Sequence, residues 1–132
     1  MRRTRSFRNA PESVPSARAF AAEVLNEEPE EVREVVALMI SELASNCVRH
    51  ADTEFEVTIS RSGGEVRVEA MDCGSGAPSM RDAGPADPHG RGLQIIDMLS
   101  SSWGFSTLPK GGKTVWFALA SQVPGEVEGA LA

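Results

Sequence analysis

Hydrophobic residues recur at helical spacing in two stretches near the start of the chain. Residues 16–25 predict a short helix that ends at Asn26. Its apolar side consists of Ala17, Phe20, Ala21, Val24 and Leu25. A longer helix is predicted from Pro29 to about His50, because proline suits a first helical turn and acidic residues follow it. Its core face would hold Val32, Val36, Met39, Ile40, Leu43 and Cys47.

Alternating apolar and polar residues then predict four strands in two hairpins. Residues 55–60 and 66–70 alternate on either side of a Ser-Gly-Gly turn, which is typical of a β-hairpin. A second hairpin is predicted from residues 103–105 and 113–119, across a turn that contains proline and glycine. The period of residues 93–100 indicates a short helix between the two hairpins.

Polar side chains interrupt these apolar patterns at two places. Glu42 and Asn46 lie one turn apart on the long helix and border its buried face. Counting by two from Ala70 places Asp72 on the core face of its strand. Burying such a group without a partner costs about 1–3 kcal/mol or more, so each one bonds a backbone group, a water or a ligand.

A long glycine- and proline-rich segment, residues 72–90, follows this aspartate. Such a segment suits a lid or a binding loop, and it is also compatible with a simple irregular excursion. It ends at Gly90-Arg91-Gly92, and glycines at a helix start let free N–H groups point at an anion.

Composition and charge fit one soluble folded domain. The 132 residues are 41% hydrophobic and 24% charged, unlike a disordered tail or a coiled coil. With 13 basic and 19 acidic residues, the net charge of −6 argues against a protein whose main task is to neutralise a nucleic-acid backbone. The arginine-rich residues 1–12 are compatible with a nucleic-acid arm or an edge strand, and residues 121–132 with a flexible tail after a domain at 13–120.

The cysteines and the hydropathy indicate a cytoplasmic protein. The two cysteines and two histidines have no metal-ligand spacing, so Cys47 and Cys73 are expected to be reduced thiols. No apolar run approaches the roughly 20 residues that cross a bilayer, and no signal-peptide core follows the first arginines. We therefore expect no membrane partner.

Three short motifs resemble the boxes of the Bergerat ATP-binding domain of the GHKL superfamily. Residues 42–51 (ELASNCVRHA) resemble its N box, residues 72–76 (DCGSG) its G1 box and residues 90–93 (GRGL) its G2 box. Residues 112–117 (GKTVWF) resemble its closing strand. The resemblance implies an α+β fold, a two-layer α/β sandwich in which about three helices cover one face of a mixed, mostly antiparallel sheet.

The resemblance also implies ATP and Mg²⁺ as cofactors and a role for each box residue. Glu42 would be the catalytic general base, or would order the water shell of the metal, and Asn46 would ligate Mg²⁺. Asp72 would accept a hydrogen bond from the adenine amino group, and Thr114 would support it through a hydroxyl or a water. The glycine boxes would lie beside the base and the phosphates through Gly74, Gly76, Gly90, Arg91, Gly92 and Leu93. For Arg49, His50 and Arg91, a phosphate or partner contact and a surface position are both compatible with the sequence.

Within the superfamily, the Arg-His-Ala end of the N box and the closing strand resemble anti-sigma-factor serine kinases. Such a protein sequesters a sigma factor and phosphorylates a serine of an anti-anti-sigma protein of the STAS type. The family typically forms homodimers, so a homodimer is an open expectation here. The alternative is a nucleotide-gated binding module of the same fold that transfers no phosphate. A histidine-kinase catalytic domain that acts on a separate protein is a more remote alternative.

Overall fold

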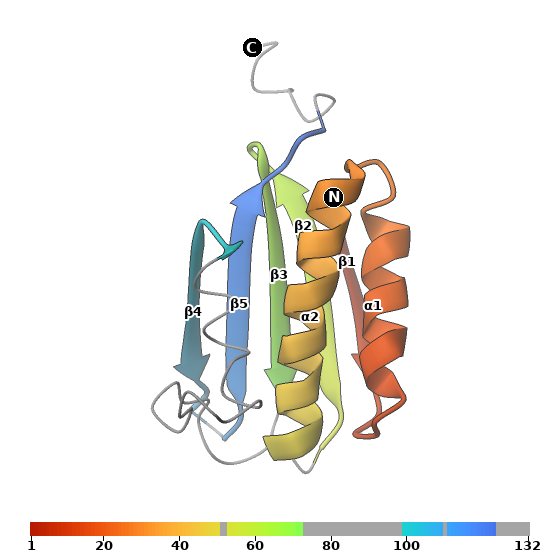
Figure 1. Cartoon of the computed structure of the whole chain (residues 1–132). Helices are drawn as coiled ribbons and strands as arrows, with labels where there is room; N and C mark the ends of the chain where they lie inside the picture. Colours follow the sequence, from red (N-terminus) through yellow and green to blue (C-terminus); the bar gives the residue numbers. More distant parts are fainter. Residues whose placement is uncertain (51–52, 73–98, 110, 124–132) are drawn as a thin grey trace, which may run out of the picture.

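The computed structural model describes residues 1–50, 53–72, 99–109 and 111–123, and over these ranges its elements follow the predicted order. Figure 1 shows the two described helices on one face of a single sheet. The predicted third helix falls almost wholly outside the described residues, which include only its last two positions, 99 and 100. The elements are β1 (Arg2–Phe7), α1 (Ser13–Val24), α2 (Glu30–His50), β2 (Phe55–Ser62), β3 (Glu65–Asp72), β4 (Ser102–Thr107) and β5 (Lys113–Ala120).

The sheet has the strand order β1-β2-β3-β5-β4, and each pairing among these described strands is antiparallel. The turn between β2 and β3 uses Gly63 and Gly64 at φ values of 59° and 76°. Only glycine adopts such positive φ values without strain, which explains why the hairpin turns at this point. The predicted α+β class with a mostly antiparallel sheet is thus confirmed.

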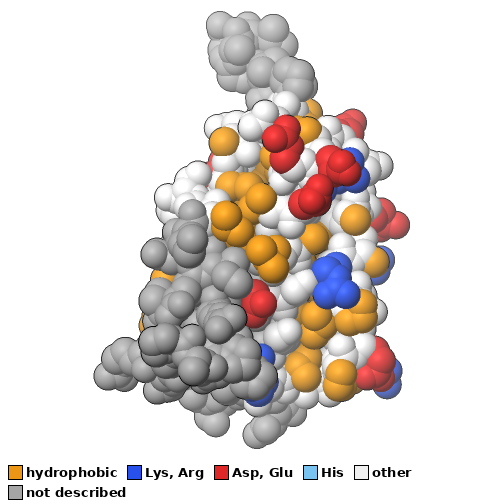
Figure 2. All heavy atoms as spheres, in the orientation of Figure 1, with side chains coloured by type: hydrophobic (Ala, Val, Ile, Leu, Met, Phe, Trp, Pro, Cys, Tyr) orange, Lys and Arg blue, Asp and Glu red, His pale blue; other side chains and the backbone are white. Residues whose placement is uncertain are grey.

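The two described helices agree with the sequence pattern to within a few residues. Helix α1 begins at Ser13, three residues earlier than predicted, because Pro15 falls in the first turn, where a missing N–H costs no helical hydrogen bond. Helix α2 begins at Glu30, one residue after the predicted start at Pro29, and Figure 2 shows acidic groups gathered over its start. No helix among the described residues is long and apolar enough to cross a membrane.

The core lies between the helices and one face of the sheet. Side chains alternate along β2 and β3, so every second residue is buried under the helices and its neighbours lie on the open face. Phe7 joins β1 to this core, since its ring stacks on Phe55 at 5.5 Å and meets Phe20 edge-on at 6.1 Å. The basic start of the chain is therefore an edge strand of the sheet, paired with β2 alone among the described strands.

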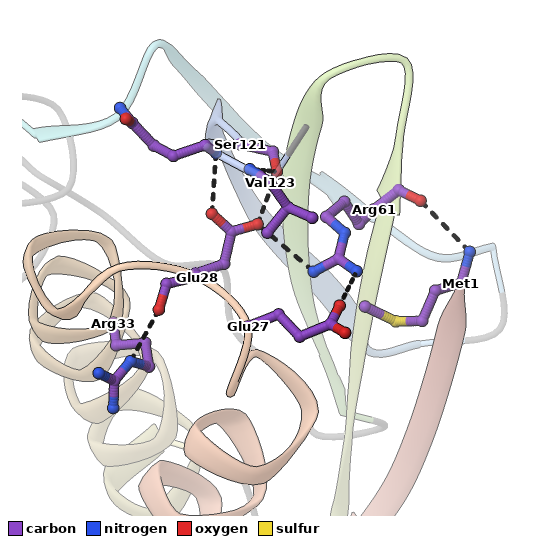
Figure 3. Close-up of polar contacts among 8 residues, drawn as sticks. Met1, Glu27, Glu28, Arg33, Arg61, Ser121 and Val123 are labelled. Carbon is purple, nitrogen blue, oxygen red and sulfur yellow. Dashed lines mark hydrogen bonds and ion pairs between the residues drawn. The ribbon is translucent and has the colours of Figure 1, made fainter. Parts of the chain in front are cut away.

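A buried carboxylate joins the connection between α1 and α2 to the end of β2 and to the chain that follows β5. Glu28, in the connection between α1 and α2, is fully enclosed and accepts hydrogen bonds from the Ser121 hydroxyl at 2.6 Å and the Gln122 amide at 2.9 Å (Figure 3). Arg61 at the end of β2 donates to the same carboxylate at 3.4 Å and to Glu27 at 3.2 Å. The cluster ties the helix connection to β2 and to the chain that leaves β5.

Candidate functional site

Helix α2 carries Glu42 and Asn46 at the border of its buried face, as the helical wheel predicts. Both residues are half-buried, whereas Leu43 and Cys47 beside them are buried. Within the described part of the chain, neither side chain forms a hydrogen bond or an ion pair. Because half-buried polar groups normally find partners, these two are available to a ligand.

Asp72 ends β3 on the core face, which confirms its predicted inward orientation. The residue is only 2% exposed. Its Cα partner on β5 is Lys113, whose Nζ lies 3.2 Å from Oδ2 and 3.3 Å from Oδ1. The Lys113 side chain is 4% exposed, so the two residues form a buried ion pair at the end of the sheet.

Cys47 brings α2 to the same carboxylate. Its thiol is a hydrogen-bond donor to Asp72, so the ion pair has a third member from the helix layer. Asn9 also contacts this end of the helix, since its amide donates to the Cys47 carbonyl at 3.2 Å and to the Thr53 carbonyl at 3.3 Å. In Figure 1, the end of α2, the end of β3 and the start of β5 meet at one end of the molecule.

The environment of Cys47 suppresses its ionisation. Burial raises the pKa of the thiol from 9.0 to about 12, and the negative charge of Asp72 and the hydrogen bond to it act in the same direction. The ammonium of Lys113 opposes this pKa shift only in part. Cys47 is accordingly a neutral hydrogen-bond donor and not a thiolate at physiological pH.

This raised pKa predicts a loss of stability in alkali. Between pH 9.0 and about 12 the unfolded chain releases the Cys47 proton and the folded chain keeps it, so the free energy of unfolding falls as the pH rises through this window. The slope from this one group approaches about 1.4 kcal/mol per pH unit. Urea unfolding of the parent and of Cys47→Ser at pH 8 to 10.5 measures how the free energy of unfolding of each protein depends on pH. Parallel curves for the two proteins would contradict the assignment.

The structure places the side chain of Thr114 on the face of the sheet opposite to Asp72. Thr114 is the Cα partner of Met71, and directly opposed residues of antiparallel strands share a face. Since neighbouring residues point to opposite faces, the Thr114 side chain lies on the open face and Asp72 lies on the helix face. Lys113, one residue earlier, makes the contact with Asp72 that the sequence motif suggested for Thr114.

The other predicted contacts lie outside the described residues. They are Gly74, Gly76, Gly90, Arg91, Gly92 and Leu93. Of Arg49 and His50 at the end of the N box, the structure describes the side chain of Arg49, which is exposed at the end of α2. The described part of the site therefore consists of the α2 pair, the Asp72–Lys113 ion pair and Cys47.

The sequence reading missed Lys113 and the polar role of Cys47. A signal for Lys113 was available, because counting back by two from Phe117 and Val115 places it on the core face, where a lysine requires a partner. Cys47 was predicted to be an ordinary core residue, and it is buried among apolar groups. Its contact with Asp72 depends on how α2 packs on β3, which periodicity alone does not determine.

Comparison with known proteins identifies the family. The family model of the histidine kinase-like ATPase domain matches residues 7–119. The chain belongs to this family. Among solved structures, the crystal structure of full-length ShkA in complex with AMPPNP matches with a TM-score of 0.55 and 19% identity, over 86% of this chain and 32% of that protein. This likeness shows a common fold, and the chain spans about a third of that protein's length. No protein with a curated description matches the chain.

The described residues fit the ATP that membership in this ATPase family implies. Asp72 offers a buried carboxylate, the kind of acceptor that an exocyclic amino group of a base requires. Glu42 and Asn46 on the adjoining helix offer oxygens that have no partner in the described part of the chain. Among the described residues no three metal-binding side chains come together.

Proposed function

We propose that the protein is an ATP-dependent anti-sigma regulator that phosphorylates a serine of an anti-anti-sigma protein. One observation carries the phosphoryl-transfer part: α2 brings Glu42 and Asn46, two half-buried polar residues without partners among the described residues, to the end of the sheet that holds Asp72. The motifs of the N box and the closing strand, which resemble anti-sigma-factor serine kinases, support the choice of partner.

The described residues would divide the work as follows. Asp72 accepts a hydrogen bond from the amino group of the base and so fixes the nucleotide at the deep end of the site. Asn46 supplies an amide oxygen that suits Mg²⁺, which would neutralise charge on the phosphates when bound. Glu42, one helical turn away, accepts the proton of the attacking serine hydroxyl or orients that hydroxyl. Most of the rate enhancement in phosphoryl transfer comes from such positioning and charge stabilisation.

A capture experiment tests the proposal as a whole. The purified protein is incubated with a lysate of its source cells, with and without Mg-ATP, and captured proteins and new phosphoserine are identified by mass spectrometry. The proposal expects a sigma factor together with a small antagonist that carries a new phosphoserine. Capture without new phosphate would favour the nucleotide-gated binding module, and an acid-labile phosphohistidine would favour a histidine kinase.

Replacing Glu42 with alanine tests the catalytic assignment. We expect phosphate transfer to slow by about 100-fold, the usual contribution of a general base, while ATP binding changes little because the base touches the acceptor hydroxyl and not the nucleotide. Transfer is measured with labelled ATP and binding by calorimetry. Glu34→Ala is the matched control, since Glu34 is an exposed glutamate on the same helix. Equal transfer rates in both variants would remove Glu42 as the base.

A further inference from the structure

Strand β1 forms one edge of the sheet, beside α1, and pairs with β2 alone among the described strands (Figure 1). Met1 and Arg61 exchange both backbone hydrogen bonds, at 3.3 and 2.9 Å. In an antiparallel pair such bonded positions alternate with unbonded ones, so every second residue of β1 turns its N–H and C=O groups away from β2. These outward residues, all exposed, are Arg2, Thr4 and Ser6. The edge therefore presents backbone donors and acceptors at the spacing that a further strand requires.

The side chains that flank this edge on its helix side are basic. Arg3 and Arg5 share this side of β1 with Phe7, and both are exposed. Arg3 Nη2 lies 4.0 Å from the Glu23 carboxylate, and the two side chains are 54% and 65% exposed, so this ion pair is weak. The guanidinium of Arg5 lies 5.0 Å from the centre of the Phe20 ring. The described part of the chain thus neutralises these two cations only slightly.

We propose that the β1 edge binds an extended acidic segment of a partner protein, which adds a further strand to the sheet. The backbone of that segment pairs with the outward N–H and C=O groups of β1, and these hydrogen bonds supply the affinity. Acidic side chains at alternate positions of the segment lie opposite Arg3 and Arg5 and supply the selectivity. This surface is independent of the nucleotide site, because β2 separates β1 from the strand that carries Asp72.

The register of a strand added antiparallel to β1 explains why its charge matters. The outward residues of β1 form the hydrogen-bonded pairs with this strand, so Arg3 and Arg5 fall at the non-hydrogen-bonded pairs. The Cα atoms of such pairs are about 4.5 Å apart instead of about 5.5 Å, which brings opposed side chains closest together. Opposite charges at these positions stabilise the pairing. A segment with glutamate or aspartate at every second position therefore fits this edge.

The row of backbone groups favours a polypeptide over a nucleic acid. A nucleic acid would meet the arginines through its phosphates and would leave the strand-spaced N–H and C=O groups of β1 unused, whereas a peptide strand uses both. The charge of the whole chain also opposes a polyanionic backbone, since 19 acidic residues stand against 13 basic ones. An acidic peptide segment meets the local positive charge without requiring a basic molecule.

Peptides of defined charge test the edge on the full chain. The probe is a capped peptide of alternating threonine and glutamate, as long as the six residues of β1, and the matched control alternates threonine and lysine. Hydrogen exchange followed by NMR should slow at the Thr4 and Ser6 amides by at least about tenfold when the glutamate peptide binds. The Arg3 and Arg5 amides, already bonded to β2, should change little. The glutamate peptide should bind at least about fivefold more tightly than the lysine peptide.

Variants of the protein and of the peptide separate charge from backbone pairing. Arg5→Gln should weaken binding of the glutamate peptide by about fivefold and leave the affinity for Mg-ATP unchanged. Arg18→Gln is the matched control, because Arg18 is an exposed arginine that bonds Ser41 of α2 and lies off the edge. N-methylation of alternate peptide residues removes backbone donors and should abolish binding.

Three results would overturn the proposal. The first is equal affinity for the two peptides, or unchanged exchange at the Thr4 and Ser6 amides. The second is slow exchange of these amides in the free protein together with a dimer in sedimentation, which would assign the edge to a second copy of the chain. The third is tighter binding of a single-stranded oligonucleotide than of the glutamate peptide, lost in Arg5→Gln, which would assign the edge to a nucleic acid.

Discussion

Replacing Asp72 with asparagine is expected to weaken ATP binding by about 10- to 100-fold, because hydrogen bonds to charged groups contribute about 1.5–3 kcal/mol. The same change should lower the free energy of unfolding by about 3 kcal/mol or more, because it strands the buried ammonium of Lys113. Calorimetry with Mg-ATP and urea denaturation measure the two effects on the same protein.

The two effects of Asp72→Asn are separable with a double variant. In Asp72→Asn combined with Lys113→Gln, two neutral amides replace the buried charges, so most of the lost stability should return. ATP affinity should stay low, because the acceptor for the base is still missing. If Asp72→Asn binds ATP as tightly as the parent, the assignment of Asp72 to the base is wrong. If affinity and stability return together, the loss of binding reflects folding alone.

Replacing Glu28 with alanine should cause the largest loss of stability outside the nucleotide site, about 3–5 kcal/mol, the usual cost of breaking a buried ion pair from one side. The change leaves Arg61 buried at 8% side-chain exposure and removes the acceptor of the Ser121 hydroxyl and the Gln122 amide. Urea denaturation of the parent and the variant at neutral pH gives the difference.

Glu27 is the matched control for this prediction. It also pairs with Arg61, at 3.2 Å, but its side chain is 68% exposed. An exposed partner contributes less than about 1 kcal/mol, so Glu27→Ala should be close to neutral. If Glu27→Ala and Glu28→Ala lower the free energy of unfolding by similar amounts, burial of the Glu28 carboxylate does not make its contacts with the chain after β5 more stabilising than the exposed Glu27 pair.

The sequence predicted most of the fold because local patterns dominate it. Strands β2 and β3 alternate strictly and turn at two glycines, and α2 has an apolar arc framed by a first-turn proline and acidic residues. The predicted start of α1 was three residues too late, because the proline there is compatible with either a helical or a non-helical turn. Pairing of β1 with β2 joins residues that lie 48 to 58 positions apart, such as Phe7 with Phe55 and Arg2 with Ser60, and no local pattern specifies it.

The site was predicted less completely, and strand register is the reason. Asp72 is on the expected face because the alternation of β3 runs through it. Thr114 and Lys113 differ by one residue, and one residue exchanges the two faces of a strand. The motif resemblance favoured the threonine for its hydroxyl, whereas the alternation of β5 buries the lysine. The contact of Cys47 with Asp72 depends on how α2 packs on β3, and neither the sequence of α2 nor the sequence of β3 specifies that packing alone.

The exposed edge strand has a consequence for association between copies of the protein. An unpaired strand edge is a template for edge-to-edge aggregation, and natural sheets protect such edges with charged side chains. Strand β1 has arginine at three of its six positions, Arg2, Arg3 and Arg5, all exposed. If two copies joined through this edge, cations would crowd along the seam, and like charges directly opposite one another are destabilising. The arginines on β1 therefore disfavour extension of the sheet by a second copy at this edge.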